Sequence, residues 1–219
     1  MDKTRVESSV IADELFVRYP SLDSCRESIT DAHKMLLRSY EGGGKLLLAG
    51  NGGSAADSDH ISGELNKSFR FKRPVDDYLA SELERLYGED GRSLTASLEG
   101  GLPAIPLTLF NASNSAFNND VSSESAYAQL VQVLGNKGDV FIGITTSGNS
   151  GNIVKAIMAA KARGLSTIAL TGETGGKCKG LADICICVPE KDTFKVQELH
   201  LPVYHALCAM VESDMFRLP

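Results

Sequence analysis

The sequence lacks the features that mark membrane-spanning and exported proteins. No apolar run reaches the roughly 18 residues that an α-helix needs to cross a bilayer. Residues 1–16, MDKTRVESSVIADELF, contain no apolar core of the kind found in signal peptides. The five cysteines are an odd number, and their scattered positions fit neither a disulfide framework nor paired CxxC zinc motifs. We therefore expect a protein of the reducing cytoplasm with no membrane partner.

Positive charge is also scarce. The chain has 22 Lys and Arg against 28 Asp and Glu, a formal net charge of −6. Nucleic-acid backbones are bound by clustered Lys and Arg, so we expect no nucleic-acid partner. A small anion remains possible, because backbone N–H groups can bind one without net positive charge.

Five punctuated apolar segments indicate the fold. Most are continuously apolar, which is typical of strands covered on both faces. They lie at 45–50, 104–110, 139–146, 166–172 and 183–189. Helical patterns separate several of them, as in SGNIVKAIMAAKARGL. The sequence therefore predicts an α/β fold with a doubly wound, mostly parallel five-stranded sheet and helices on both faces, as a single domain over 1–219. Two helices are predicted within 1–40, and a long helix through KVQELHLPVYHALCAMVESDMF closes the chain.

Two glycine-rich turns follow predicted strands, where ligands bind in such sheets. In the first, GNGGSAAD at 50–57, the start of the following helix favours an anion, although an ordinary tight turn would look the same. It matches neither a P-loop nor GxGxxG, so we expect no nucleotide cofactor. The second, TTSGNSGN at 145–152, gathers hydroxyl groups around a glycine, which favours a phosphate monoester. Its hydroxyl residues are Thr145, Thr146, Ser147 and Ser150.

Four further polar residues could form a metal or proton-transfer site on two helices. His60 and Glu64 are four residues apart, which places their Cβ atoms about 5–6 Å from each other on one helix face. Gln197 and His205 are about two helical turns apart in the last helix. Simpler interpretations remain open: His60 and Glu64 as a surface pair, and His205 as a hydrogen-bonded core residue. Asp57 shares the face of His60 and could orient it.

The remaining histidines and a cysteine pair are interpreted as structural. His33 is expected at the surface of the second helix, and His200 in a structural position in the last helix. Cys185 and Cys187 alternate with isoleucines in ICICVP, which predicts a strand with both thiols on one face. Both are expected to be plain core residues.

Several motifs occur in a recognisable order between about residues 45 and 216. They are AGNGGSAADSDHISGEL, FNND, GDVFIGITTSGNSGNIVKAI, ALTGETGGK and DTFKVQELHLPVYH. With them the chain resembles the sugar isomerase (SIS) domain family and, within it, the phosphoheptose isomerases. TSGNS is shared by SIS domains in general, whereas the His60/Glu64 pair with VQE…H is specific to the heptose branch.

The resemblance implies a Rossmann-like fold, a homotetramer with active sites shared between subunits, and a sugar phosphate as substrate. The implied reaction is an aldose–ketose isomerisation of sedoheptulose 7-phosphate to a D-glycero-D-manno-heptose 7-phosphate through an enediol. Glu64 and His205 would move protons. Zinc would be held by His60, Glu64, Gln197 and His205. The implied substrate-binding residues are Asn51, Gly52, Gly53, Ser54, Asn119, Asp120, Thr145, Thr146, Ser147, Ser150, Thr193 and Gln197.

The chain departs from the family pattern in three places. Residues 71–104 would be an insertion, since this connection is much shorter in most relatives, and its leucine spacing predicts that it is partly helical. Such an insertion could act as a lid, alter substrate choice or extend an interface. Pro202 interrupts the hydrogen bonding of the last helix between Gln197 and His205. Serines follow FNND where relatives commonly carry Gly-Tyr.

Two alternative functions remain open at this point. One is a non-catalytic SIS protein that binds a sugar phosphate or a protein partner as a regulator. The other is an isomerase of a different sugar phosphate, because a phosphate grip and a Glu/His pair do not specify the length of the sugar.

Overall fold

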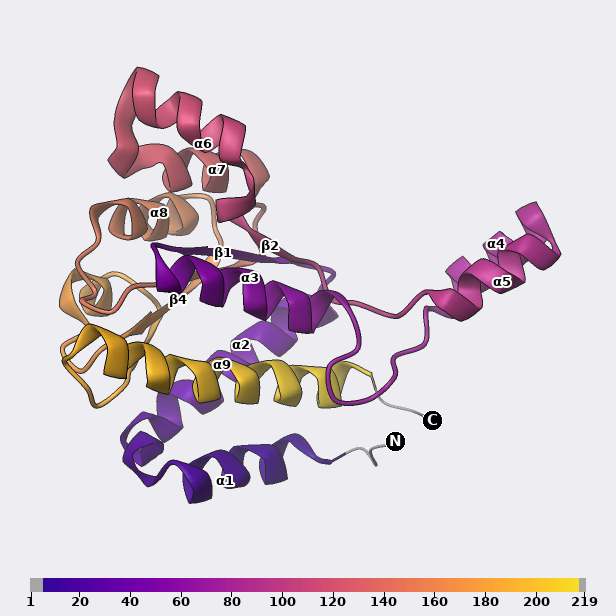
Figure 1. Cartoon of the computed structure of the whole chain (residues 1–219), viewed down its shortest axis with the longest axis horizontal. Helices are drawn as coiled ribbons and strands as arrows, with labels where there is room; N and C mark the ends of the chain where they lie inside the picture. Colours follow the sequence, from indigo (N-terminus) through magenta and orange to yellow (C-terminus); the bar gives the residue numbers. More distant parts are fainter. Residues whose placement is uncertain (1–5, 217–219) are drawn as a thin grey trace.

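The computed structural model describes residues 6–216; residues 1–5 of the predicted N-terminal helical segment lie outside them. The predicted α/β fold is confirmed (Figure 1). All strand pairs of the sheet are parallel, in the order β2-β1-β3-β4-β5. The strands are β1 (Leu46–Gly50), β2 (Ala104–Pro106), β3 (Val140–Ile144), β4 (Ser166–Thr171) and β5 (Ile184–Cys187).

Helices cover both faces of this sheet. One face packs against α2 (Arg26–Glu41), α3 (Gly53–Asn66) and α9 (Thr193–Met215), and α1 (Ser8–Arg18) packs on α9 outside them. The other packs against α7 (Ala126–Leu134) and α8 (Gly151–Ala162). Successive residues of a strand point to opposite faces, so Leu46 and Leu48 enter the first core and Leu47 the second. Each buried leucine contributes about 1.5–3 kcal/mol, which explains why the strands are continuously apolar.

Short helical turns complete the connections. A 3₁₀ helix at Pro20–Cys25 joins α1 to α2, and others lie at Leu107–Leu109, Ser123–Ser125 and Gly176–Gly180. α6 (Asn111–Phe117) leads into a π-helical turn at Asn118–Ser122. The strand predicted over 104–110 is shorter than expected, because the chain turns into a 3₁₀ helix after Pro106, which has no N–H to offer the ladder.

Two antiparallel helices, α4 (Asp77–Tyr87) and α5 (Glu89–Ser97), form a hairpin that projects from the body (Figure 1). Asp76 caps α4 by accepting a hydrogen bond from the N–H of Leu79 at 2.9 Å. The helices approach closely at Gly91, where a Cβ atom would lie 2.0 Å from the Leu83 carbonyl oxygen. Gly91 is the one buried residue of the two helices. The prediction of a partly helical segment is confirmed.

A buried ion pair anchors the base of this hairpin. Arg73 and Glu212 are both 0% exposed, and Arg73 Nε lies 2.7 Å from Glu212 Oε1. The guanidinium also donates to the carbonyl oxygens of Leu65 at 2.7 Å and Glu64 at 2.8 Å, at the end of α3. Glu212 accepts two further hydrogen bonds, at 2.9 Å, from backbone N–H groups that follow α3. The pair therefore links α3 to α9.

Helix α9 continues through Pro202, which is buried within it. The helix keeps Gln197 and His205 on one continuous element that lies alongside α3. None of the described helices is both long enough and apolar enough to cross a membrane.

Candidate active site

The first glycine-rich turn joins β1 to α3 at the carboxyl edge of the sheet. A Cβ atom on Gly50 would lie 2.2 Å from the carbonyl oxygen of Ser54, so a larger residue does not fit there. Gly52 has φ 55, in the left-handed region that glycine adopts readily. α3 begins at Gly53, and Ser54 is buried in its first turn, at 3% exposure. The positive end of the helix dipole therefore lies where a ligand of the sheet would bind.

The second turn joins β3 to α8. The Thr145 and Ser150 hydroxyl oxygens lie 2.9 Å apart, and Thr145 is 4% exposed. Thr145 therefore stabilises the loop from its buried side. Ser147 is exposed at its tip. Gly148 has φ 67, and a Cβ atom there would lie 2.1 Å from the carbonyl oxygen of Gly175. The segment after β4 thus packs directly against this loop.

The two turns are connected by a pair of amides. Asn51 Nδ2 donates to Asn152 Oδ1 at 3.0 Å, and Asn152 Nδ2 donates to Asn51 Oδ1 at 2.8 Å. Asn51 was predicted as a site residue, whereas Asn152 was not, although it lies in the TTSGNSGN motif. The sequence shows Asn152 only as the second asparagine of that motif. Residue spacing does not predict its contact with Asn51, because Asn51 lies in a different loop 101 residues earlier.

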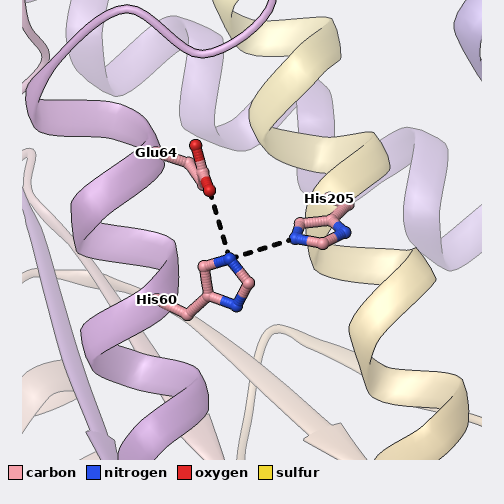
Figure 2. A group of neighbouring side chains, drawn as sticks. All are labelled: His60, Glu64 and His205. Carbon is pink, nitrogen blue, oxygen red and sulfur yellow. Dashed lines mark hydrogen bonds and ion pairs between the residues drawn. The ribbon is translucent and has the colours of Figure 1, made fainter.

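Three of the predicted metal ligands meet between α3 and α9 (Figure 2). His60 Nε2 lies 3.1 Å from Glu64 Oε1 and 3.3 Å from His205 Nε2. One ligand atom from each of the three residues lies within 4.8 Å of the others. Two facing helices therefore bring three of the four predicted side chains together, whereas Gln197, the fourth, does not join them. The interpretation of His60 and Glu64 as a mere surface pair is therefore not favoured.

A hydrogen-bond chain that the sequence did not reveal fixes the orientation of His60. The Tyr204 hydroxyl donates to Asp57 Oδ1 at 3.3 Å and lies 3.0 Å from His60 Nδ1. Because its hydrogen points to Asp57, the Tyr204 oxygen accepts a hydrogen from Nδ1 of His60. Asp57 thus orients His60 through Tyr204 rather than by direct contact.

The hydrogen bonds from Asp57 through Tyr204 to His60 leave Nε2 of His60 with a lone pair that it can donate. In neutral His60 with hydrogen on Nδ1, Nε2 carries none and faces the Glu64 carboxylate and His205. Lone pairs of this kind gather stably around a proton or a metal cation. Two imidazole nitrogens and a carboxylate oxygen form a donor set that zinc accepts, and the outer Tyr204–Asp57 link resembles the orienting contacts of metal-bound histidines.

Burial and neighbouring charge set the protonation of the cluster. Burial lowers the pKa of His205, repulsion from the protonated form of His60 would lower it further, and Glu64 opposes both effects. His205 is therefore neutral near pH 7 and has a lone pair to offer. Burial raises the pKa of Asp57, partly offset by its hydrogen bond from Tyr204.

The other predicted residues lie outside this cluster. The Gln197 side chain packs against Gly53, whose Cβ position would be 2.5 Å from Gln197 Nε2, so Gln197 touches the first turn rather than the histidines. Thr193 is exposed at the first residue of α9. Asn119 and Asp120 lie exposed in the π-helical turn, where Asn119 Nδ2 donates to Asp120 Oδ1 at 2.8 Å.

A groove of about 330 Å³ opens beside His205. Its polar lining includes Arg18, Tyr19 and Arg70, from α1, its C-terminal cap and the loop after α3. A larger cavity, of about 520 Å³, lies at the base of the α4–α5 hairpin and contains none of the predicted site residues. Size alone therefore does not locate the site, whereas the convergence of titratable groups does.

Comparison with known proteins agrees with this arrangement. Residues 8–97 and 101–172 match the SIS domain. The chain belongs to the SIS domain family. Among its SIS relatives, phosphoheptose isomerases of Aneurinibacillus thermoaerophilus and Burkholderia pseudomallei are 38% and 39% identical, each over 97% of this chain and 89% and 90% of their own.

Solved structures of this family have the same fold. The phosphoheptose isomerase of Neisseria gonorrhoeae aligns with a TM-score of 0.68 at 30% identity, covering 94% of this chain and 91% of that one. The phosphoheptose isomerase of Francisella tularensis aligns with a TM-score of 0.70 at 28% identity, covering 92% of each chain.

Proposed function

We propose that this SIS protein is an aldose–ketose isomerase that converts sedoheptulose 7-phosphate to a D-glycero-D-manno-heptose 7-phosphate through an enediol. The observation that carries the proposal is the convergence of His60, Glu64 and His205 between α3 and α9. Hydrogen bonds between Asn51 and Asn152 join the two glycine-rich turns, which supports a single binding region for the sugar phosphate. Relatives that align with nearly the whole chain are phosphoheptose isomerases.

The phosphate end of the substrate is assigned to the two turns. The hydroxyl groups of Ser54, Thr146, Ser147 and Ser150 would donate to phosphate oxygens, aided by the N-termini of α3 and α8. Asn51, Asn119, Asp120, Thr193 and Gln197 are proposed to contact the sugar. Gly52 has open space where a Cβ atom would lie, so the backbone could approach the ligand there, and Gly53 makes room for the Gln197 side chain that would contact the sugar.

The carbonyl end is assigned to Glu64 and His205. The Glu64 carboxylate would take a proton from C1 of the ketose, which leaves an enediolate. The Glu64 acid so formed can exchange its proton with solvent, and it would then protonate C2 to give the aldose. His205, kept neutral by burial, would accept the O1 proton as the new carbonyl forms at C1 and supply the one that O2 needs. Proton removal beside a carbonyl requires such a base and such a shuttle within hydrogen-bond reach of the substrate atoms that lose and gain protons.

Zinc is the metal that we propose for the donor set. His60, Glu64 and His205 would hold it, and Gln197 would join them after its side chain leaves Gly53. A bound zinc ion would polarise the substrate carbonyl and stabilise negative charge on its oxygen. The lone pairs that converge from three side chains support this assignment.

A second subunit is proposed to complete the site, within a homotetramer in the cytoplasm. The His60 side chain is 43% exposed and the groove beside His205 is open, so a neighbouring subunit would exclude water from the reacting groups. All five cysteines are free, as expected in a reducing compartment.

Proton exchange in heavy water tests the proposal. Sedoheptulose 7-phosphate incubated with the protein should lose the proton beside its carbonyl and yield aldose signals by NMR. We expect Glu64→Gln to lower turnover by about 10²–10⁴-fold, because it removes the base but keeps the shape. Glu198→Gln, a matched change at an exposed position of α9, should keep full turnover.

Each part of the proposal has its own contradicting result. Full turnover in Glu64→Gln would refute the role of Glu64 as base. Full turnover in chelator-treated protein that contains no zinc by elemental analysis would refute the metal. Exchange without the expected product would indicate another sugar phosphate. Binding without exchange on any C5 to C7 ketose phosphate would establish the regulatory alternative.

A further inference from the structure

Two half-buried thiols lie side by side on the edge strand β5. Cys185 and Cys187 point to the same face of the sheet, and their sulfur atoms lie 3.5 Å apart. The Thr171 hydroxyl lies 3.6 Å from both sulfurs. Neither thiol takes part in the proposed isomerisation. At this distance the S–H group of one cysteine donates a hydrogen bond to the sulfur of the other.

The surroundings favour a thiolate on Cys187 rather than on Cys185. The pKa of Cys187 is lowered to about 6, chiefly by the hydrogen bond from Cys185, with support from Thr171 and from the Lys179 ammonium. The hydrogen bond with Cys187 raises the pKa of Cys185, and burial raises it further. The Cys25 S–H donates to the Cys187 carbonyl oxygen at 3.0 Å, which is a contact with the backbone of Cys187 and not with its thiol.

We propose that Cys185 and Cys187 form a peroxide-reactive dithiol, in which Cys187 is the attacking thiolate and Cys185 the resolving thiol. The Cys187 sulfur attacks one peroxide oxygen and breaks the O–O bond, which gives a sulfenic acid and, after protonation, water. The Cys185 sulfur then attacks the Cys187 sulfur, a second water leaves, and a disulfide forms. The two thiols are oxidised and one hydrogen peroxide is reduced to two waters.

The position of the pair makes this ring closure feasible but strained. Alternate residues of an extended strand have Cα atoms about 6.6 Å apart, which lies at the long end of the range that a disulfide spans. β5 is an edge strand that pairs only with β4 in the described sheet, so it can bend at low cost. A strained disulfide is readily reduced, so the oxidation would be reversible.

The dithiol contacts the segment that supports the phosphate loop. The Cys187 sulfur packs under Gly175, 3.0 Å from where a Cβ atom of that glycine would lie. The Gly175 carbonyl oxygen in turn packs against Gly148, and Gly176 against the Ser147 carbonyl oxygen. Movement of the Cys187 sulfur toward Cys185 removes the support beneath Gly175. Disulfide formation is therefore expected to weaken the grip of Ser147 on phosphate, an effect that rests on the proposed function.

Mass spectrometry tests the chemistry independently of turnover. The reduced full-length protein is treated with hydrogen peroxide at pH 7, alkylated and digested, and the peptide that contains both cysteines is analysed. We expect that peptide to lose two hydrogen atoms, resist alkylation and recover after reduction by dithiothreitol. Cys185→Ser should give a sulfenic acid at Cys187 that dimedone labels, and Cys187→Ser should react slowly. Cys178→Ala is the matched control, since burial raises the pKa of that thiol to about 11.

Activity of the oxidised protein tests the link to the phosphate loop. We expect KM for sedoheptulose 7-phosphate to rise about fivefold with little change in kcat, which is the cost of roughly one hydrogen bond to the phosphate. A peptide that keeps both hydrogens, or that is oxidised beyond the sulfenic acid without a disulfide, overturns the dithiol. A disulfide that forms with no change in KM overturns its coupling to the loop. Absence of turnover in the reduced protein refutes only the isomerase assignment.

Discussion

The body of the protein and the α4–α5 hairpin use the same interactions in opposite settings. In the hairpin, Arg85 pairs with Glu82 and Arg92 with Glu84 at the surface, where water and salt screen the charges. At its base, Arg73 and Glu212 are completely buried. A buried ion pair is stable only when other hydrogen bonds replace those that water would make to its two groups. Arg73 and Glu212 make five hydrogen bonds, one to each other and four to backbone groups.

Apolar side chains differ between the two regions in the same way. Both faces of the central strands are covered, so Leu47 and Phe141 are 0% exposed. In the hairpin Tyr78, Leu86 and Tyr87 are between 55% and 78% exposed. The body is therefore held together by tertiary packing, whereas the hairpin relies on local signals such as the Asp76 cap and on contacts between its own helices.

The largest expected effect comes from breaking the buried pair. Arg73→Met should lower the free energy of unfolding in urea by about 3–5 kcal/mol, because Glu212 is left charged without its partner. The double change Arg73→Met with Glu212→Leu should recover part of the loss, since no charge then stays buried. A loss below about 1 kcal/mol in the single variant would mean that this junction behaves like the exposed pairs of the hairpin.

Between pH 6.5 and 4, acid should weaken the body more than the hairpin, because residues 77–97 contain no histidine. His200 is 0% exposed, and burial lowers its pKa to about 4, an effect that the Thr171 backbone partly opposes. His200 of the unfolded chain therefore takes up a proton near pH 6.5, whereas His200 of the folded chain does so only near pH 4. The free energy of unfolding consequently falls as pH drops from 6.5 toward 4, by up to about 3 kcal/mol. Burial lowers the pKa of His33 too, which adds to the loss.

Urea titrations at several pH values check this prediction. His200→Gln should flatten the slope between pH 6.5 and 4, and a chain without the hairpin should keep the full slope. An unchanged slope in His200→Gln would show that other groups control the acid sensitivity of the body.

The smallest effect is expected from removing the hairpin. Gly100 N donates to the Arg73 carbonyl oxygen at 2.9 Å, so the two segments that leave the body are adjacent and a short Gly/Ser linker can replace 77–97. We expect the urea midpoint of the body to stay unchanged while the helical circular dichroism signal decreases. A large drop in midpoint would show that the hairpin is part of the same cooperative unit.

The strands and the two turns were predictable because their signals are local. Continuous apolar runs followed by glycine mark buried parallel strands, and the spacing of His60 and Glu64 fixes a shared helix face. The contacts between distant segments were not predictable in this way. Tyr204 reads as one more apolar position of the last helix, and only the packing of α9 on α3 brings it to His60 and Asp57.

His33 illustrates the same limit. It was expected at the surface, but it is 8% exposed and pairs with Asp214 of α9 at 3.0 Å, so the surface prediction was wrong. The sequence of α2 does not indicate this burial, because the covered face of α2 depends on the packing of α9, which begins 160 residues after His33 (193 − 33). Cys185 and Cys187 do share one strand face as predicted, but they are half-buried rather than core residues.

The short strand β2 has a consequence for how copies of this chain can associate. It lies at the edge of the sheet, has three residues and ends in Pro106, which cannot donate a hydrogen bond to an added strand. A second molecule therefore finds almost no ladder to extend along that border, which protects the protein from edge-to-edge aggregation at high concentration. Ordered assembly along this side must instead use helix surfaces, where side-chain complementarity rather than backbone pairing selects the partner.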